Sequence, residues 1–515
     1  MATSSLPFGI ARLFANVRSA AQLDRESIAA FRIAAGCVLV ADALLRSRDF
    51  WLFFSREGIF PLDTLQKYLE PGCWSLNFLN EALWWQGAML VAEAVAGLSL
   101  MAGYFSSISC FVAWVIWISI LRRTEPAANA GDYWMACLLY WGMFLPLGDM
   151  LSIDSLLRKK TKYATMSLAS AAFLVQVLAV YLYAGFSKLQ GDWLNGSAVG
   201  YILSVHDHGT WVGEFLNASK TTTSLLTTST LLLEIGGTFL FLLCGNRSAR
   251  RLIALSFILF HIGIWITLSV GLFSPIGITA WLALMPWHTK HAQPDIERQE
   301  NNRDHRPFFH CPEGVLHCVV IASLFVAGLA LFYNVSGLGE KRPRWITTAI
   351  NALTLEQPWG VFGRVGSQEQ WVTGKASLKD ASVIDLLRQG SPFRAVRPPG
   401  GFSSLPNHRW HKIFWELPKT RQAPLRESVA AGLVADWNRR HLESEAVKVL
   451  EIYFTQVIHQ NEGTAHEFPQ LNQEGIAQEF APNTTLRQWL LACWPPRGVG
   501  SGNLDRFLDE NKSTP

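Results

Sequence analysis

The chain has 515 residues, of which 50% are hydrophobic and 16% are charged, with 21 Trp and 31 Phe. Charges are sparse before about residue 333 and frequent after it, which is typical of a polytopic membrane region followed by a water-soluble domain. A net charge of +4 without a basic block argues against a nucleic-acid-binding protein, and eight cysteines without a CxxC pair argue against a zinc ribbon or a thioredoxin-like motif.

Residues 1–26 predict a cytoplasmic or interfacial segment. Apolar residues recur at helical spacing between positions 8 and 18, beside Arg12 and Arg18, which favours a short helix on the membrane surface; a disordered tail is the alternative. Arginines precede a full-length apolar segment, so no cleaved signal peptide is indicated and the first helix should stay in the membrane.

Residues 27–333 predict a polytopic α-helical bundle of about nine membrane spans. Apolar stretches of about 20 residues can cross a hydrocarbon core of ~30 Å, and the short eighth stretch could be re-entrant. The nine stretches are 27–45, 82–104, 106–121, 132–150, 166–188, 224–245, 252–270, 271–287 and 314–333.

Basic loops set the expected orientation. Arg158–Lys162 follows the fourth stretch and Arg247–Arg251 follows the sixth, and both loops share the side of the N-terminus if nine spans alternate. The positive-inside rule then places all three in the cytoplasm. We therefore expect a multi-pass protein of a cell membrane, most simply a bacterial inner membrane, with its C-terminal region outside.

The region 334–515 predicts an extracytoplasmic α+β domain. Residues 370–376 read as a strand, 427–441 as an amphipathic helix and 447–459 as a β-branched strand. Before this domain, His288, His291, His305 and His310 cluster with Cys311, but their spacing matches no ligand pattern, so we expect a solvated linker and no metal site.

Ionisable residues inside the predicted spans are few. Each costs on the order of 2.5–3.5 kcal/mol at mid-helix, so each should face a partner or a wet cavity. They are Arg32, Asp42, Glu93, Asp149, Lys188, Glu234 and His261. Arg32 and Asp42 lie too far apart on one helix to pair, so Glu93 or Glu234 is the expected partner of Arg32. These residues indicate either interhelical ion pairs that fix packing or a polar cavity that holds a small molecule.

Lys188 lies where the apolar stretch ending at residue 188 gives way to a polar turn. Its ammonium either snorkels to the interface or points into a cavity within the bundle, and we expect the cavity. Desolvation would free its lone pair to act as a base, with His261 as the group that relays a proton. Alternatively, His261 is a core histidine bonded to a carbonyl.

The residues around Lys188 resemble a known family. The motif residues are Tyr181, Ala184-Gly185, Lys188-Leu189, Asp192-Trp193 and Gly196, with Phe31-Arg32, Gly36 and Asp42 in the first span and His261 followed by residues 269–274 (SVGLFS). This pattern is similar to the membrane region of vitamin K-dependent gamma-carboxylases, which belong to the wider set of horizontally transferred transmembrane (HTTM) proteins. The similarity covers roughly residues 25–440.

The resemblance implies an enzyme that uses a reduced quinone, with O2 and CO2 as co-substrates, to carboxylate glutamate in a peptide or protein on the outer face. Lys188 would be the base that deprotonates the quinol, and His261 would lie in the same pocket. Arg32, Asp42, Asp149, Tyr181 and Trp193 are the residues that we expect around the cofactor.

One departure from the family bears on activity. Carboxylase members carry a histidine before a Ser-hydrophobic-Asp triplet at the end of the fourth span, and here Asp149 precedes Ser152-Ile153-Asp154. An anion close to Lys188 would favour its protonated form. The alternative is therefore a non-catalytic membrane protein that binds a lipid or quinone and recognises a partner outside; a transporter ranks third, because no internal repeat is visible.

Overall fold

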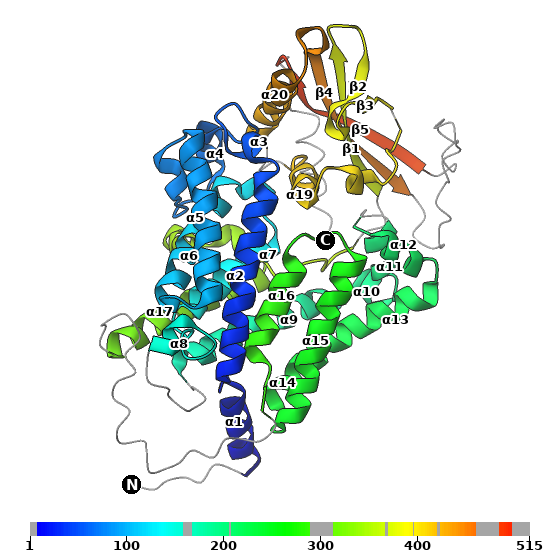
Figure 1. The fold of residues 1–515 in the computed structure, drawn as a ribbon. Coiled ribbons are helices and arrows are strands. Elements are labelled where there is room, and N and C mark those ends of the chain that lie inside the picture. The colour runs from blue at the N-terminus through cyan, green and yellow to red at the C-terminus, as the bar shows by residue number, and fades with distance from the viewer. Residues whose placement is uncertain are drawn as a thin grey trace.

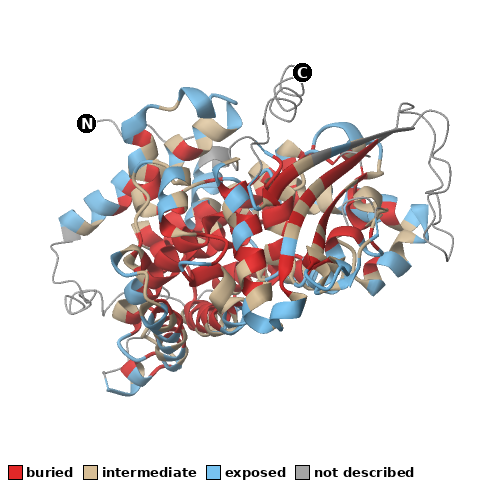
Figure 2. Cartoon of the chain, turned by 90° about the horizontal axis from the view of Figure 1, so that it is seen from above, coloured by how far each residue is buried: buried red, intermediate tan, exposed pale blue. Residues whose placement is uncertain are grey.

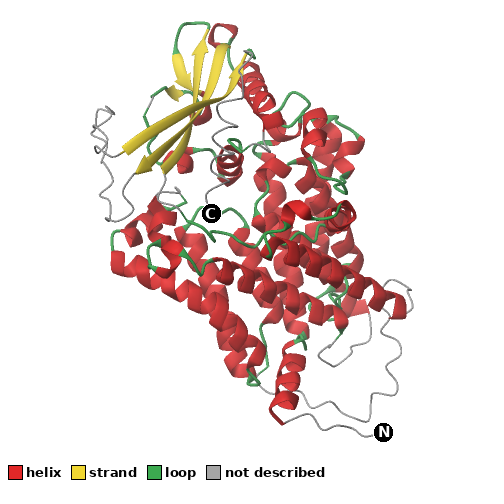
Figure 3. Ribbon diagram, turned by 180° about the vertical axis from the view of Figure 1, so that it is seen from behind, coloured by secondary structure: helices red, strands yellow, loops and turns green. Residues whose placement is uncertain are grey.

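The computed structural model describes residues 8–157, 167–204, 208–288, 313–365, 369–394, 396–419, 423–459 and 484–496. A helical bundle makes up most of the molecule, with a small sheet at one end and the N-terminal helix α1 (Phe8–Ala20) at the other (Figure 1). Seen from behind, all five strands lie together beyond the helices (Figure 3). This arrangement is the helical bundle plus α+β domain that the sequence predicts.

The bundle is built from helices that follow the apolar stretches of the sequence. They are α2 (Arg25–Ser47), α3 (Phe50–Phe54), α4 (Leu62–Tyr68), α5 (Leu83–Ala102), α6 (Ser106–Arg123), α7 (Ala130–Gly142), α8 (Ile153–Leu157), α9 (Leu168–Ser187), α10 (Gly191–Leu194), α11 (Ala198–Ser204), α12 (Trp211–Asn217), α13 (Lys220–Leu231), the π-helical turn η3 (Leu232–Gly237), α14 (Thr238–Leu243), α15 (Arg247–Thr267), α16 (Phe273–Leu284) and α17 (Glu313–Val335).

Each of the nine predicted stretches contains a helix, but the helices differ in length. Seven are long and apolar enough to cross a membrane, whereas α7 and α16 have 13 and 12 residues. α7 ends at Gly142, well before residue 150, and Pro146 follows in the turn, where it cannot continue a helix. Asp149 therefore lies in a loop. The basic residues 158–162 lie outside the described residues.

Capping residues fix where several of these helices begin. Asn129 and Asp132 form a capping box at the start of α7, and Ser167 and Ser170 do the same for α9. The Asn246 side chain accepts hydrogen bonds from two amides at the start of α15. α9 ends with Lys188 as its C-cap residue, so the lysine leaves the helix at its final turn.

The C-terminal domain is a five-stranded antiparallel sheet with helices packed against it. The strand order is β3-β2-β1-β4-β5, with α20 contacting β4 and β5. The elements are α18 (Arg344–Leu353), β1 (Glu369–Leu378), β2 (Val383–Asp385), β3 (Ser391–Pro392), α19 (His408–Glu416), α20 (Ala423–Arg440), β4 (Val447–His459) and β5 (Thr484–Trp494). The predicted strands at 370–376 and 447–459 and the helix at 427–441 correspond to β1, β4 and α20.

The C-terminal domain is joined to the bundle by buried contacts. Arg409 on α19 donates to Asp42 at 2.6 Å and to Asp132 at 3.1 Å, and Trp359 is fully buried with its ring 6.4 Å from that of Trp134. Seen from above, buried residues gather in the interior of the bundle and continue into the strands of the sheet (Figure 2). Bundle and sheet thus share one packed interior.

Candidate functional site

A cavity of about 810 Å³ lies among α7, α9 to α16 and the chain segment 359–362. Its wall is mostly Leu, Ile, Val, Phe and Trp. The ionisable side chains that line it are Tyr181, Lys188, Glu234 and His261. Apolar walls with a few convergent polar groups are typical of a site for a small organic molecule.

Lys188 is buried and paired on the cavity wall. Its side chain is 5% exposed, and its Nζ lies 3.0 and 2.9 Å from the two carboxylate oxygens of Glu234. Nζ also lies 5.2 Å from the centroid of the Trp193 ring, within cation–π range. The lysine therefore does not snorkel to the headgroups; its charge is held inside the bundle.

Glu234 reaches Lys188 from the π-helical turn η3. A single π turn inside an α-helix is rare and frequently occurs at functional sites. Gly185 allows this turn to approach α9, because a Cβ added at Gly185 would lie 3.2 Å from the Cβ of Glu234 and 2.6 Å from Cγ1 of Ile235. The sequence thus brings the carboxylate to Lys188 with a glycine on one helix and an irregular turn on the other.

His261 and Tyr181 form the second polar pair of the cavity. The Tyr181 hydroxyl lies 2.6 Å from Nε2 of His261, and the tyrosine ring packs against Phe257 and Trp281. Nδ1 of His261 is buried and has no hydrogen-bond partner among the described residues. A buried nitrogen of this kind requires an explanation, and a bound ligand is one.

Gly277 fixes the place of the His261 ring. A Cβ added at Gly277 would lie 2.2 Å from Cε1 and 2.3 Å from Nε2 of His261, closer than any Cβ contact in real proteins. The histidine therefore packs directly on the backbone of α16, and a larger residue at 277 would push the ring toward the cavity or away from Tyr181.

The cavity borders the outer surface of the bundle between η3–α14 and α15. Leu232, Leu240 and Leu259 line it and are 68, 61 and 64% exposed. In a bilayer such exposed leucines on membrane helices face lipid. On another side the Trp193 indole donates to the carbonyl of Phe362 at 2.7 Å, which ties the segment after α18 over the cavity.

Four of the seven predicted site residues line this cavity, and three do not. Lys188, His261, Tyr181 and Trp193 meet there. Asp42 pairs with Arg46 and Arg409, and Asp149 lies 3.4 Å from Arg25. Arg32 donates to the carbonyls of Leu100, Met101 and Leu151.

The expected partners of Arg32 were wrong. Glu234 is bound to Lys188, and the buried Glu93 lies near Asp42, Arg46 and Arg409. Backbone carbonyls at the end of α5 accept from Nη1 of Arg32 in place of a carboxylate. Asp149 is also not the anion beside Lys188, because it lies in the loop after α7 and pairs with Arg25 at the start of α2. The departure from the carboxylase pattern at Asp149 therefore places no anion on the cavity wall.

Sequence reasoning missed the pairing of Glu234 with Lys188 and the aromatic wall from Trp134 and Trp359. Glu234 was visible as one of the few ionisable residues in the spans, but only helix packing identifies its partner. Trp359 carries no such signal, because it lies in an extended segment outside the membrane helices.

A family model described as the HTTM domain matches residues 21–288, just over half of the chain. The chain belongs to the HTTM family. The HTTM domain contains Tyr181, Lys188, Glu234 and His261, whereas Trp359 and Phe362, which complete the cavity wall, lie beyond it. No solved structure matches this HTTM protein.

Proposed function

We propose that this HTTM protein is a membrane enzyme that binds a reduced quinone in the cavity and uses Lys188 as a base in a gamma-glutamyl carboxylase-like reaction. The substrate would be an outward-facing peptide or protein. The observation that carries the proposal is a buried lysine on the wall of a lipid-bordering apolar cavity, beside the Tyr181–His261 pair.

The residues present fit such a ring-bearing cofactor. A volume of about 810 Å³ accommodates a bicyclic ring with part of an isoprenoid tail, and the exposed leucines between η3–α14 and α15 offer the tail an apolar path. Lys188 and Nδ1 of His261 are the polar atoms that could bind the ring oxygens. When bound and oxidised by O2, a quinol would supply the strong base that removes a glutamate γ-proton before CO2 adds.

Lys188 and Glu234 can together accept a proton at the cavity wall. Transfer of the ammonium proton to Glu234 across the 2.9 Å contact would give a neutral amine beside a neutral carboxylic acid. The amine lone pair is then available to a hydroxyl bound in the cavity. His261, held by Tyr181 and packed on Gly277, would orient that hydroxyl.

The Lys188–Glu234 contact also supports a second candidate function. Both carboxylate oxygens lie within 3.0 Å of Nζ, a geometry that holds the lysine protonated when nothing else enters the cavity. In that case the protein would bind a lipid or quinone without turning it over, and the C-terminal domain would recognise a partner.

The test uses the full chain in lipid nanodiscs. Menadiol and a short-chain ubiquinol serve as cofactor probes, a glutamate-containing peptide as acceptor, and labelled CO2 as the measured substrate. Lys188→Met should abolish incorporation while quinone quenching of tryptophan fluorescence persists. Arg56→Gln is the matched control, because Arg56 is 81% exposed and does not line the cavity.

Three outcomes decide between the candidates. Incorporation by the wild type that Lys188→Met abolishes supports the enzyme. Saturable quenching without any incorporation favours the non-catalytic binder. Equal incorporation by the wild type and Lys188→Met, or no quenching by either quinone, would overturn the role of Lys188 or of the cavity.

A further inference from the structure

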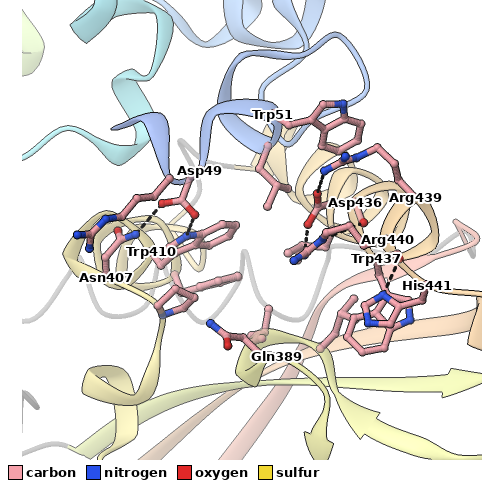
Figure 4. A pocket seen from close by; sticks show the side chains of 17 residues that line it. Asp49, Trp51, Gln389, Asn407, Trp410, Asp436, Trp437, Arg439, Arg440 and His441 are labelled. Atoms are coloured by element: carbon pink, nitrogen blue, oxygen red, sulfur yellow. Dashed lines mark hydrogen bonds and ion pairs between the residues drawn. The ribbon is translucent and has the colours of Figure 1, made fainter. Parts of the chain in front are cut away.

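A second cavity, of about 630 Å³, lies between the bundle and the C-terminal domain. Its walls come from the turn after α2, from the residues around Gln389, from the start of α19 and from the end of α20 (Figure 4). It shares no lining residue with the membrane cavity. The inference drawn from it is independent of the proposed function.

One side of this outer cavity presents a carboxylate without an ion pair. Asp49 accepts hydrogen bonds from Nδ2 of Asn407 at 2.6 Å and from Nε1 of Trp410 at 3.0 Å, both neutral donors (Figure 4). Among the described residues Asp49 forms no ion pair. A carboxylate held in place by neutral donors has lone pairs left for a cationic ligand.

The other side presents a surplus of positive charge. Arg439 and Arg440 share the single carboxylate of Asp436, which is 4% exposed. Arg439 turns toward Trp51, with its guanidinium 4.5 Å from the ring centroid, whereas the half-exposed guanidinium of Arg440 faces the open space (Figure 4). Two guanidiniums on one carboxylate leave one positive charge and free donors for an anionic ligand.

Flat side chains also line the cavity. Trp51 and Trp410 line the cavity, and Trp437 stacks on His441 with ring centroids 3.6 Å apart. Tryptophan faces bind apolar and aromatic bodies and also stabilise a nearby cation. Arg48 also lines the cavity next to Asp49, so the cavity combines a carboxylate, an excess of arginines and an aromatic surface.

We propose that the outer cavity binds a small zwitterion, an amino acid with an apolar or aromatic side chain. Its ammonium would lie against Asp49, its carboxylate against Arg440, and its side chain against the tryptophans. A purely anionic ligand would meet the unpaired charge of Asp49, and a purely cationic one would meet the surplus charge at Arg440. A zwitterion satisfies both.

The experiment measures binding by calorimetry to the full chain in detergent, with three probes that share one ring. L-Phenylalanine carries both charges, phenethylamine only the ammonium, and 3-phenylpropionate only the carboxylate. L-Phenylalanine should bind saturably, and each analogue about tenfold more weakly, the loss expected for one charged contact.

Variants test which residue contacts each charged group of the ligand. Asp49→Asn and Arg440→Gln should each weaken L-phenylalanine binding about tenfold, whereas Arg440→Lys keeps the charge and should retain most of the affinity. Asp436 keeps its 2.9 Å contact with Arg439 in both Arg440 variants, so the local fold is preserved. Arg56→Gln, outside the cavity, should bind as the wild type does.

Three results would overturn the proposal. They are the absence of saturable binding by L-phenylalanine, L-tryptophan and L-leucine; equal affinity of 3-phenylpropionate and L-phenylalanine; and unchanged affinity in both Asp49→Asn and Arg440→Gln. An unchanged unfolding temperature in each variant shows that altered binding does not reflect misfolding.

Discussion

Two of the buried charge clusters in the described bundle differ in what surrounds them. Lys188 and Glu234 form one pair on the wall of the membrane cavity. The other cluster, which we term the seam cluster, consists of Asp42, Arg46, Asp132 and Arg409, and none of its members lines that cavity.

Within the seam cluster each carboxylate contacts both guanidiniums. Two guanidiniums face two carboxylates, with Nε of Arg46 2.5 Å from Asp42, and Thr124 accepts a further hydrogen bond from Arg46. Arg409 comes from the C-terminal domain, so the cluster joins that domain to α2 and α7. Buried charge at the seam cluster joins the C-terminal domain to the bundle, whereas the Lys188–Glu234 pair borders the membrane cavity. The adjoining cavity is what marks that pair as a candidate site.

The seam cluster also holds part of the cavity wall in place. Asp132 belongs to the capping box of α7, and Trp134, two residues later, lines the membrane cavity. Phe273 lines it as well, and it follows Gly271, against which His408 packs. The C-terminal domain therefore positions the site through α19, although its sheet lies at the far end of the molecule.

The largest expected loss of stability follows from a substitution in the seam cluster. Arg409→Met leaves Asp42 and Asp132 with one guanidinium between them, and removal of one partner from a buried ion pair costs about 3–5 kcal/mol. Thermal unfolding of the detergent-solubilised protein, followed by tryptophan fluorescence, measures the loss. Arg439→Gln, at a half-exposed pair, should cost about 0–1 kcal/mol. Equal losses in the two variants would contradict the difference between buried and exposed pairs.

A double-mutant cycle on Lys188 and Glu234 measures how much the pair beside the membrane cavity contributes to stability. Each single variant, Lys188→Met or Glu234→Gln, leaves one partner unpaired, and we expect a loss of about 1–3 kcal/mol, since the adjoining cavity can admit water. The double variant should recover most of that loss. A single-variant loss as large as that of Arg409→Met would show that the pair is as enclosed as the seam cluster.

Gly277→Ala should disturb the site more than the fold. The added methyl group must displace the His261 ring, and overpacking of this kind costs about 1–3 kcal/mol. The Tyr181–His261 hydrogen bond should break, and quinone quenching should weaken. Gly328→Ala is the matched control, because Gly328 lies on α17 outside the cavity and a Cβ there meets no atom within 4 Å. Similar quenching by both variants would show that the histidine position is not set by Gly277.

Much of this organisation follows from the sequence, and the rest depends on packing. Composition and apolar stretches predict the helical bundle, and the family resemblance predicts four of the residues that meet in the cavity. The partners of Arg32 and Lys188 could not be predicted, because which carbonyls and carboxylates each cation reaches depends on how the helices are placed. The early end of α7 could have been predicted from Pro146, whereas the burial of Trp359 could not, because it lies in an extended segment without periodicity.

The smallest expected effect is on the pH dependence of the free energy of unfolding, through His408 at the contact between α19 and the bundle. Burial, together with the Arg409 guanidinium and Lys412, lowers the pKa of His408 to about 4, while Asp132 opposes the shift. Since an unfolded histidine has a pKa near ~6.5, the unfolded chain takes up this proton first as the pH falls. The free energy of unfolding should therefore decrease between about pH 6.5 and 4, by at most ~1.4 kcal/mol per pH unit from this group. Above pH 7 both states are neutral and the contribution disappears.

His408→Gln isolates this contribution from that of the carboxylates, which also titrate in acid. Unfolding temperatures of the wild type and the variant, measured from pH 7.5 to 4.5, should converge or cross as the pH falls. Only the wild type then loses the stability that depends on a neutral His408. His317→Gln serves as the control, since His317 is exposed on α17 and its replacement should leave the pH profile unchanged. Parallel profiles for the wild type and His408→Gln would show that His408 titrates as it does in water, and that the C-terminal domain does not enclose it against the bundle.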